Sequence, residues 1–264
     1  MEPQAASTLN VPNPARIYNY LHGGTHWYAW DQAAADYMTS LVPSTPKWVA
    51  MLRDFLQAAA RRLHAEGFRH FVDFASGLPT EDHVHAVLPD ARVVYSDTDP
   101  WTLHRAQKMV AGLENVLYLD HDVREPRALL ESPRMAEFLG GERRVALGLS
   151  GVSVFLPPDD LRRVFRELYD WAAPGSRLYV TYETKQPGAT TPQMEQFLEM
   201  FRQVGSPYYF YSLDECIELS APWRVPAGGL PTLADFLGLP PGHITGEDRE
   251  GVGLEFYAGI LEKP

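Results

Sequence analysis

The sequence is poor in cysteine and in positive charge, and both shortages narrow its possible function. Cys216 is the only cysteine among 264 residues, so no disulfide can form within the chain. This composition is typical of a reducing compartment, and we predict a cytoplasmic location. Lysine and arginine number 23 against 34 aspartate and glutamate residues, and they form no basic cluster. Proteins that bind nucleic acids need such clusters to neutralise phosphates, so we expect no nucleic-acid partner.

Long apolar runs are also missing. The chain contains no run of about 18 apolar residues, so we expect neither a membrane-spanning helix nor a membrane partner. Residues 1–20 have no apolar core behind a basic start, so no secretory signal is expected. The hydrophobic content of 45% is nevertheless enough for a chain of this length to bury a large core.

From residue 67 onward, apolar segments of strand length alternate with amphipathic segments of helix length. This alternation predicts parallel strands joined by helical crossovers, with helices covering both faces of one sheet. The predicted strands are residues 70–75, 91–97, 115–122, 143–156 with the following loop, 176–184 and a closing strand at 252–263. The predicted helices are two pieces within 14–41, then 46–67, 80–88 capped by Thr80, 100–113, 125–140 broken near Pro133, 158–172 and 191–205.

Polar and small residues follow successive predicted strands. In an open parallel sheet, ligands bind beyond the carboxyl ends of the strands, so these residues are expected to share one edge. The residues that we expect at this edge are Ala75, Ser76, Gly77, Asp97, Thr98, Asp99, Asp122, Val123 and Ser150.

The residue types at this edge favour a nucleoside that carries no phosphate. The first turn lacks the three glycines with which dinucleotide-binding proteins approach a pyrophosphate. An acid after the second strand suits a ribose diol, and an acid after the third suits an adenine amino group. S-adenosylmethionine has both groups and a sulfonium cation. Each acid also has a simpler interpretation: Asp97 or Asp99 could cap the helix from residue 100, and Asp122 could cap the helix from residue 125.

Three stretches resemble a known family. They are "PNPARIYNYLHGG" (12–24), "FRHFVDFASGLPT" (68–80) and "ARVVYSDTDP" (91–100). The chain resembles the bacterial class I S-adenosylmethionine-dependent methyltransferase-like family that was formerly filed as a domain of unknown function and is now labelled S-adenosyl methyltransferase. The resemblance covers most of residues 12–185 and the last strand.

The resemblance implies a Rossmann-like α/β fold with a seven-stranded, mostly parallel sheet whose last strand is antiparallel. It implies an N-terminal helical lid or extension over residues 1–66 and a methyltransferase core over 67–264. Within that core, the composition of residues 206–251, rich in proline and glycine, indicates an insertion. It places Asp73, Ala75, Ser76 and Gly77 at the methionine part, Asp97 and Asp99 at the ribose, and Asp122 and Val123 at the adenine. It also places Arg16, Tyr20 and Gly24 in the lid motif that closes over the cofactor.

The chain departs from the family pattern on the substrate side. Ala75 stands where the family has a loop glycine, and Val154 and Tyr182 align with two family histidines. Methyl transfer needs a base only when the nucleophile must lose a proton. The candidate catalytic residues here are His26, Tyr182 and Glu183. His22 and His26 lack an evident third ligand, so no metal is expected.

The resulting hypothesis is an S-adenosylmethionine-dependent methyltransferase with a small-molecule acceptor, such as an aromatic compound or a specialised metabolite. The alternative is a protein of the same fold that binds S-adenosylmethionine without transferring its methyl group, for regulation or for other chemistry. The sequence does not indicate the oligomeric state.

The first prediction concerns Asp97. If its carboxylate binds the ribose, Asp97→Ala should weaken S-adenosylmethionine binding at least about tenfold, because two hydrogen bonds to a charged group are lost. Isothermal titration calorimetry measures this change directly. An unchanged dissociation constant would mean that Asp97 only caps a helix.

Overall fold

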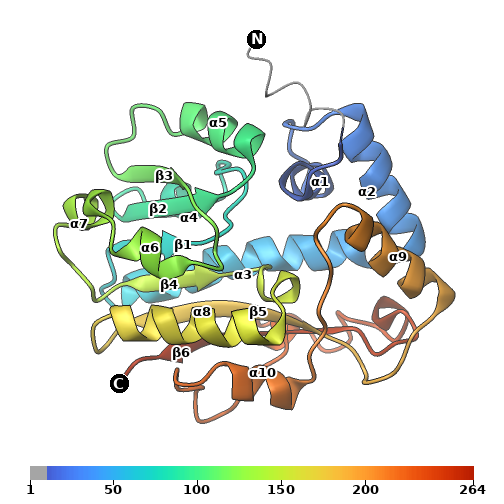
Figure 1. Ribbon diagram of the computed structural model, residues 1–264. Helices are drawn as coiled ribbons and strands as arrows, with labels where there is room; N and C mark the ends of the chain where they lie inside the picture. The colour runs from blue at the N-terminus through green and yellow to red at the C-terminus, as the bar shows by residue number, and fades with distance from the viewer. Residues whose placement is uncertain (1–10) are drawn as a thin grey trace.

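The computed structural model describes residues 11–264, and the strands within this range form one six-stranded sheet (Figure 1). The order across the sheet is β3-β2-β1-β4-β5-β6; the first five strands run parallel, and β6 is antiparallel to β5. The strands are β1 (His70–Asp73), β2 (Arg92–Asp97), β3 (Val116–Asp120), β4 (Ala146–Leu149), β5 (Arg177–Thr184) and β6 (Glu255–Glu262).

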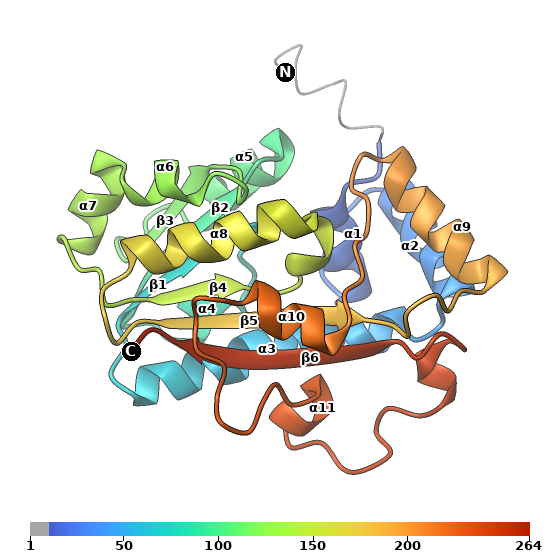
Figure 2. The same ribbon diagram turned by 60° about the horizontal axis from the view of Figure 1, so that its bottom comes forward.

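Helices cover both faces of this sheet, and Figure 2 shows α8 on one side of the sheet and α3 on the other. The α-helices are α1 (Pro14–Leu21), α2 (Ala29–Leu41), α3 (Thr45–Ala65), α4 (Val84–Val87), α5 (Pro100–Met109), α6 (Pro126–Leu130), α7 (Pro133–Leu139), α8 (Pro158–Trp171), α9 (Pro192–Gln203), α10 (Leu213–Leu219) and α11 (Leu233–Phe236). Two short 3-10 helices add η1 (Ser153–Phe155) and η2 (Glu247–Arg249). The predicted break near Pro133 is confirmed by the division into α6 and α7.

The strands are apolar throughout because side chains alternate between two buried faces. On β1, Phe71 belongs to the core cluster on the α3 face and Val72 to the cluster on the α8 face. On β2, Tyr95 lies in the cluster on the α3 face and Val94 in the cluster on the α8 face. This two-sided burial is the reason why the strands lack the polar alternation of a solvent-facing sheet.

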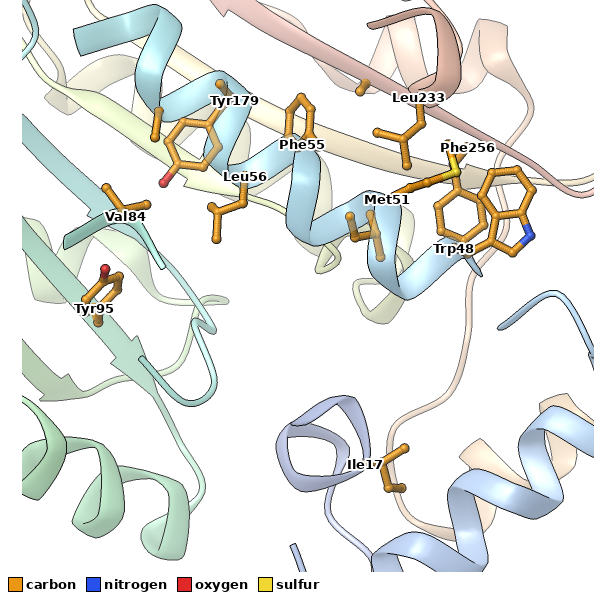
Figure 3. Packing of buried hydrophobic residues seen from close by; sticks show 14 of the residues in the cluster. Ile17, Trp48, Met51, Phe55, Leu56, Val84, Tyr95, Tyr179, Leu233 and Phe256 are labelled. Atoms are coloured by element: carbon orange, nitrogen blue, oxygen red, sulfur yellow. The ribbon is translucent and has the colours of Figure 1, made fainter. Parts of the chain in front are cut away.

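Helix α3 packs its apolar stripe directly against the sheet. Phe55 and Leu63 are fully buried, and the Trp48 ring stacks on Phe256 of β6 at a centroid distance of 4.3 Å. Figure 3 shows Met51, Phe55 and Leu56 on the side of α3 that faces this core. In contrast, Figure 1 shows α1 and α2 together with α9 beyond the end of the sheet. The first ten residues of the predicted extension over 1–66 lie outside the described residues.

The implied seventh strand is replaced, in the described part of the chain, by two isolated bridges on the free edge of β6. Arg224 pairs with Glu262, and Thr232 pairs with Tyr257. Prolines at 222, 226 and 231 lie in this segment. Because proline has no N–H to donate to a ladder, these prolines disfavour a continuous strand there.

The helix predicted over 80–88 is shorter than expected, and the prediction that Thr80 caps it is wrong. The α4 helix begins at Val84, and the side chain of His83 accepts from the Val84 N–H. The Thr80 hydroxyl instead donates to Asp82 at 2.6 Å. Residues 80–82 therefore form a turn that continues the loop after β1.

Across residues 11–264, no helix is both long and apolar enough to cross a membrane.

Gly148 of β4 provides a test of this packing. A Cβ there would lie 2.2 Å from the Tyr179 Oη and 2.3 Å from the Asp73 Oδ1. We expect Gly148→Ala to lower the free energy of unfolding by about 1–3 kcal/mol through overpacking. Gly246→Ala is the matched control, because a Cβ at Gly246 would meet no atom within 4 Å. Thermal unfolding that gave equal melting temperatures for the two variants would contradict this packing.

Candidate functional site

A cavity of about 970 Å³ lies at the carboxyl ends of the strands. The turns after β1, β2, β3 and β4 form one side of it, and side chains of α1, α3 and α9 form the other. Most of the residues expected at this edge line the cavity, together with Asp73 of β1; they are Ala75, Ser76, Gly77, Asp97, Thr98, Asp99, Val123 and Ser150.

The loop after β1 is fixed by hydrogen bonds to its backbone. The Gly77 N–H donates to the Asp97 Oδ2 at 3.1 Å, and the Gly77 carbonyl accepts from the Tyr118 hydroxyl at 2.6 Å. The Ser76 N–H donates to the Ser96 carbonyl at 2.8 Å. The loop is therefore attached to β2 and β3 and presents its backbone to the cavity.

Ala75 and Gly77 both have left-handed backbone conformations, with φ values of 50° and 62°. Glycine adopts this conformation without strain, whereas the Cβ of alanine makes it costly. The sequence places alanine where the resemblance has glycine, and the structure shows that this alanine is strained. Ala75 is exposed and lines the cavity.

Asp97 and Asp99 have different roles. The Asp99 side chain accepts from the Thr102 N–H at 2.7 Å and is the N-cap of α5. The Asp97 carboxylate accepts from the Asp99 and Gly77 N–H groups, one on each oxygen. Each carboxylate oxygen can accept a second hydrogen bond, so Asp97 keeps capacity for a diol. Burial raises the pKa of the Asp97 carboxyl.

After β3, Val123 lines the cavity but Asp122 is not among the described residues that do. The Asp122 carboxylate instead pairs with Arg124, whose side chain donates to both of its oxygens. This pairing lowers the pKa of the Asp122 carboxyl. Asp122 is also not the cap of α6, because the N-cap position is Glu125.

Asp73 is buried at the inner end of the cavity. Its Oδ1 accepts from the Tyr179 hydroxyl at 2.8 Å, and its Oδ2 lies 3.8 Å from the His83 Nε2. Burial raises the pKa of the Asp73 carboxyl to about 6, although the Tyr179 hydrogen bond opposes that rise. Gly148 leaves the room that this pair needs.

The predicted lid residues Arg16, Tyr20 and Gly24 are not found among the described residues that line the cavity. The Arg16 Nε donates to Asp31 at 2.7 Å, and the Tyr20 hydroxyl donates to Asp36 at 3.0 Å, so both join α1 to α2. A Cβ at Gly24 would lie 2.3 Å from the Asn19 side chain. Ala15, Ile17, Tyr18 and Asn19 of the same motif do line the cavity.

Of the three candidate catalytic residues, Glu183 lines this cavity. Tyr182 precedes it on β5 and points to the α8 face, where its hydroxyl contacts Ser220. Adjacent strand residues face opposite sides of a sheet, so the two cannot share the site. His26 lines a separate pocket of about 300 Å³ beside Arg105. Burial and that guanidinium lower the pKa of His26.

Glu183 is a buried acid in a largely apolar part of the cavity. It is 7% exposed, and desolvation raises its pKa to about 8. Its register partner on β6 is Phe256, which also lines the cavity. Within residues 11–264, burial is the one cause of the raised pKa of Glu183, with no hydrogen bond opposing it. Aromatic rings dominate this part of the wall: Phe155, Phe197, Phe201, Tyr208, Phe210 and Phe256.

The sequence reasoning missed Arg53, a buried cation of α3 that also lines the cavity. A signal was present. Val49, Leu52 and Leu56 form an apolar stripe at helical spacing, and Arg53 interrupts the same face. An arginine in a core-facing stripe indicates a buried partner or a ligand.

Comparisons with known proteins agree with this geometry. A family model described as S-adenosyl methyltransferase matches residues 2–230. A Mycobacterium marinum protein named "Putative S-adenosyl-L-methionine-dependent methyltransferase" is 28% identical over 159 residues, which are 58% of this chain and 50% of that protein. The chain thus spans about half the length of this curated relative.

Two solved structures match nearly the whole chain. A Thermobifida fusca protein, described as a "putative methyltransferase", has a TM-score of 0.83 and 28% identity, over 99% of this chain and 98% of that one. A Streptomyces avermitilis protein of the "duf574 family" has a TM-score of 0.83 and 24% identity, over 97% and 99%. The fold is therefore the α/β methyltransferase fold, with a mixed sheet of six strands in the described range.

The residues at the strand ends fit S-adenosylmethionine. The Asp97 carboxylate retains acceptor capacity for a ribose diol, and the β1 loop presents bare backbone between Asp73 and Asp97. Val123 offers an apolar contact for the adenine ring. The sequence has no glycine-rich phosphate loop, which matches a ligand without phosphate.

The strain at Ala75 generates a prediction. Ala75→Gly should raise the free energy of unfolding by about 0.5–1 kcal/mol, because relief of the left-handed strain exceeds the entropy that glycine gains in the unfolded chain. Thermal unfolding measures the difference. Ala75→Val should lower the stability at the same position, since a branched side chain tolerates this conformation less well. A destabilised glycine variant would contradict the strain.

Proposed function

The chain belongs to the S-adenosyl methyltransferase family, and on that premise we propose that it methylates a small aromatic acceptor bearing an ionisable hydroxyl or amine. The observation that carries this proposal is the continuity of the cavity. One cavity joins the strand-end rim, with Asp97 and the β1 loop, to a part with aromatic walls that contains Glu183.

The aromatic part of the cavity supports the class of acceptor. Phe155, Phe201 and Tyr208 form a cluster in which ring centroids lie 4.5–6.0 Å apart. Pockets with such walls favour planar apolar ligands, and a few polar groups then set orientation. Glu183 is the buried acid next to these rings. A hydroxyl or amine on the acceptor could therefore hydrogen-bond to the Glu183 carboxyl group.

Glu183 supports the proposed proton transfer. When bound, S-adenosylmethionine supplies an activated methyl group on a positively charged sulfur. The chain must align the acceptor and accept its proton, and alignment alone contributes about 7–11 kcal/mol in favourable cases. A base is most effective when its pKa lies near the working pH. With a pKa of about 8, Glu183 meets that condition, and its Oε would receive the proton.

We also propose that α1 and α2 act as the lid of this site. Their support is the position of α1, where Ala15, Tyr18 and Asn19 face the cavity opposite the β1 loop. The Arg16–Asp31 and Tyr20–Asp36 contacts join the two helices, so they would move as a unit.

The test of the function is a panel of acceptors. The purified chain is incubated with S-adenosylmethionine and with phenols, aryl amines, aliphatic alcohols and aliphatic carboxylic acids of similar size. Mass spectrometry detects the methylated product and S-adenosylhomocysteine. We expect turnover with members of the aromatic classes. Cofactor binding without turnover of any aromatic acceptor would count against the proposal and favour a protein that binds the cofactor without methyl transfer.

The pH dependence tests the role of Glu183. With a responsive acceptor, kcat/KM should rise with pH towards a plateau above about pH 8, because only the ionised carboxylate accepts a proton. Glu183→Gln should lower kcat by about 100-fold or more and remove this rise. Glu255→Gln is the control, since Glu255 is also buried but pairs with Arg249 outside the cavity. A wild-type profile retained by the Glu183 variant would refute the role.

A further inference from the structure

Arg53 is a buried cation in the cavity wall, and the function described so far does not use it. It is 6% exposed and lies on α3 among apolar residues that also line the cavity. A charged side chain at such depth needs a partner, since removing a charge from water costs several kcal/mol. The atoms around Arg53 therefore decide what it does.

The guanidinium has donors that the described residues do not satisfy. Its Nε and Nη1 are buried and have no hydrogen-bond partner within residues 11–264. Leaving buried donors unpaired is costly, and arginine presents its donors in a planar fork. The fork is thus available for an acceptor that the chain itself does not supply.

Asp82 is the nearest carboxylate, but it does not fill that place. Its Oδ2 lies 3.6 Å from the Arg53 Nε, beyond hydrogen-bond distance. Its oxygens accept instead from other groups, Oδ2 from His22 at 2.5 Å and Oδ1 from Thr80 at 2.6 Å, and the distance to Arg53 excludes a further hydrogen bond. Asp82 therefore offsets part of the charge of Arg53, and within residues 11–264 the Nε and Nη1 groups remain without an acceptor.

The remaining neighbours are equally incomplete partners. The Arg53 guanidinium carbon lies 5.3 Å from the centre of the Tyr18 ring, a cation–π contact that takes none of the fork's donors in its plane. Asp73 is close enough for Arg53 to lower the pKa of its carboxyl, yet its Oδ1 accepts from Tyr179. Asp73 and Arg53 both line the cavity, so a carboxyl group and a guanidinium cation face the same space.

We propose that Arg53 binds the carboxylate of the amino-acid part of S-adenosylmethionine. An α-amino acid group is a zwitterion, and Arg53 with Asp73 provides one site of each sign for it. A carboxylate matches the arginine fork in a bidentate pair, the geometry for which arginine is better suited than lysine. The same loop whose Gly77 binds Asp97 at the ribose end continues to Asp82 beside Arg53.

A carboxylate on the acceptor is the other possible source, and the choice of ligands separates the two. S-adenosylhomocysteine carries the amino-acid part, whereas 5′-methylthioadenosine has the same nucleoside without it. The proposal rests on the cofactor and not on the proposed aromatic acceptor. Binding without an acceptor therefore tests it separately from the methyl transfer.

Isothermal titration calorimetry of both ligands with the full chain is the experiment. Arg53→Gln should weaken S-adenosylhomocysteine about 10- to 100-fold, because a charged bidentate pair is lost. It should change the dissociation constant of 5′-methylthioadenosine less than about threefold, since the nucleoside contacts do not involve Arg53. Retained binding of 5′-methylthioadenosine also shows that the variant is folded. Arg53→Lys should fall between wild type and Arg53→Gln, because it keeps the charge and loses the fork.

Arg61→Gln is the matched control on the same helix, because Arg61 is exposed and donates to Gln57 at 2.9 Å. It should change neither dissociation constant. Two results would overturn the proposal. Equal weakening of both ligands by Arg53→Gln would mean a structural role for Arg53. Unchanged binding of S-adenosylhomocysteine would mean that Arg53 does not bind this carboxylate, as expected if the acceptor supplies it.

Discussion

The backbone N–H and carbonyl of Gly77 are both hydrogen-bonded to neighbouring strands, and the shape of the cavity at the strand ends depends on these two bonds. The Gly77 N–H donates to Asp97 and its carbonyl accepts from Tyr118, so one loop residue is bound to two neighbouring strands. Because both bonds are partly buried, they are expected to be stronger than the same bonds at a fully exposed surface. They fix the distance between the β1 loop and the acid of β2. A ligand that spans the two therefore meets a preformed surface.

The cavity combines two environments that suit two different ligands. Its strand-end side is polar and offers fixed backbone and carboxylate acceptors, whereas its aromatic side offers little besides Glu183. The acid on the aromatic side is destabilised in its charged form by desolvation, and that is why its pKa is high. The same low polarity makes the unpaired donors of Arg53 costly. Both residues are thus more responsive to a ligand than they would be at a surface.

The N-terminal motif illustrates how a recognisable sequence can act indirectly. Arg16 is fully buried against Asp31, whose oxygens also accept from the N–H groups of Asn13 and Tyr28. Asp31 thereby fixes the start of α2 relative to α1. Other residues of the same motif, among them Ala15, Ile17, Tyr18 and Asn19, line the cavity. The motif positions part of the cavity wall, and its Arg16 joins α1 to α2 through Asp31.

The strands, most helices and the sheet edge that bears the cavity could be predicted from the amino-acid sequence, because they follow from local periodicity and from the direction of parallel strands. It also placed Asp97 and the β1 loop at the site. It left open which acid is a cap, and Asp99 proved to be that residue. The packing of residues 11–264 is needed to show that Glu183 and not Tyr182 faces the cavity, that the Nε and Nη1 of Arg53 have no acceptor among those residues, and that Asp122 pairs with Arg124. The face of β5 depends on register with β4 and β6, and the surroundings of Arg53 depend on residues about 30 positions away. Such contacts are set by the packing of α3 on the sheet, which no local pattern encodes.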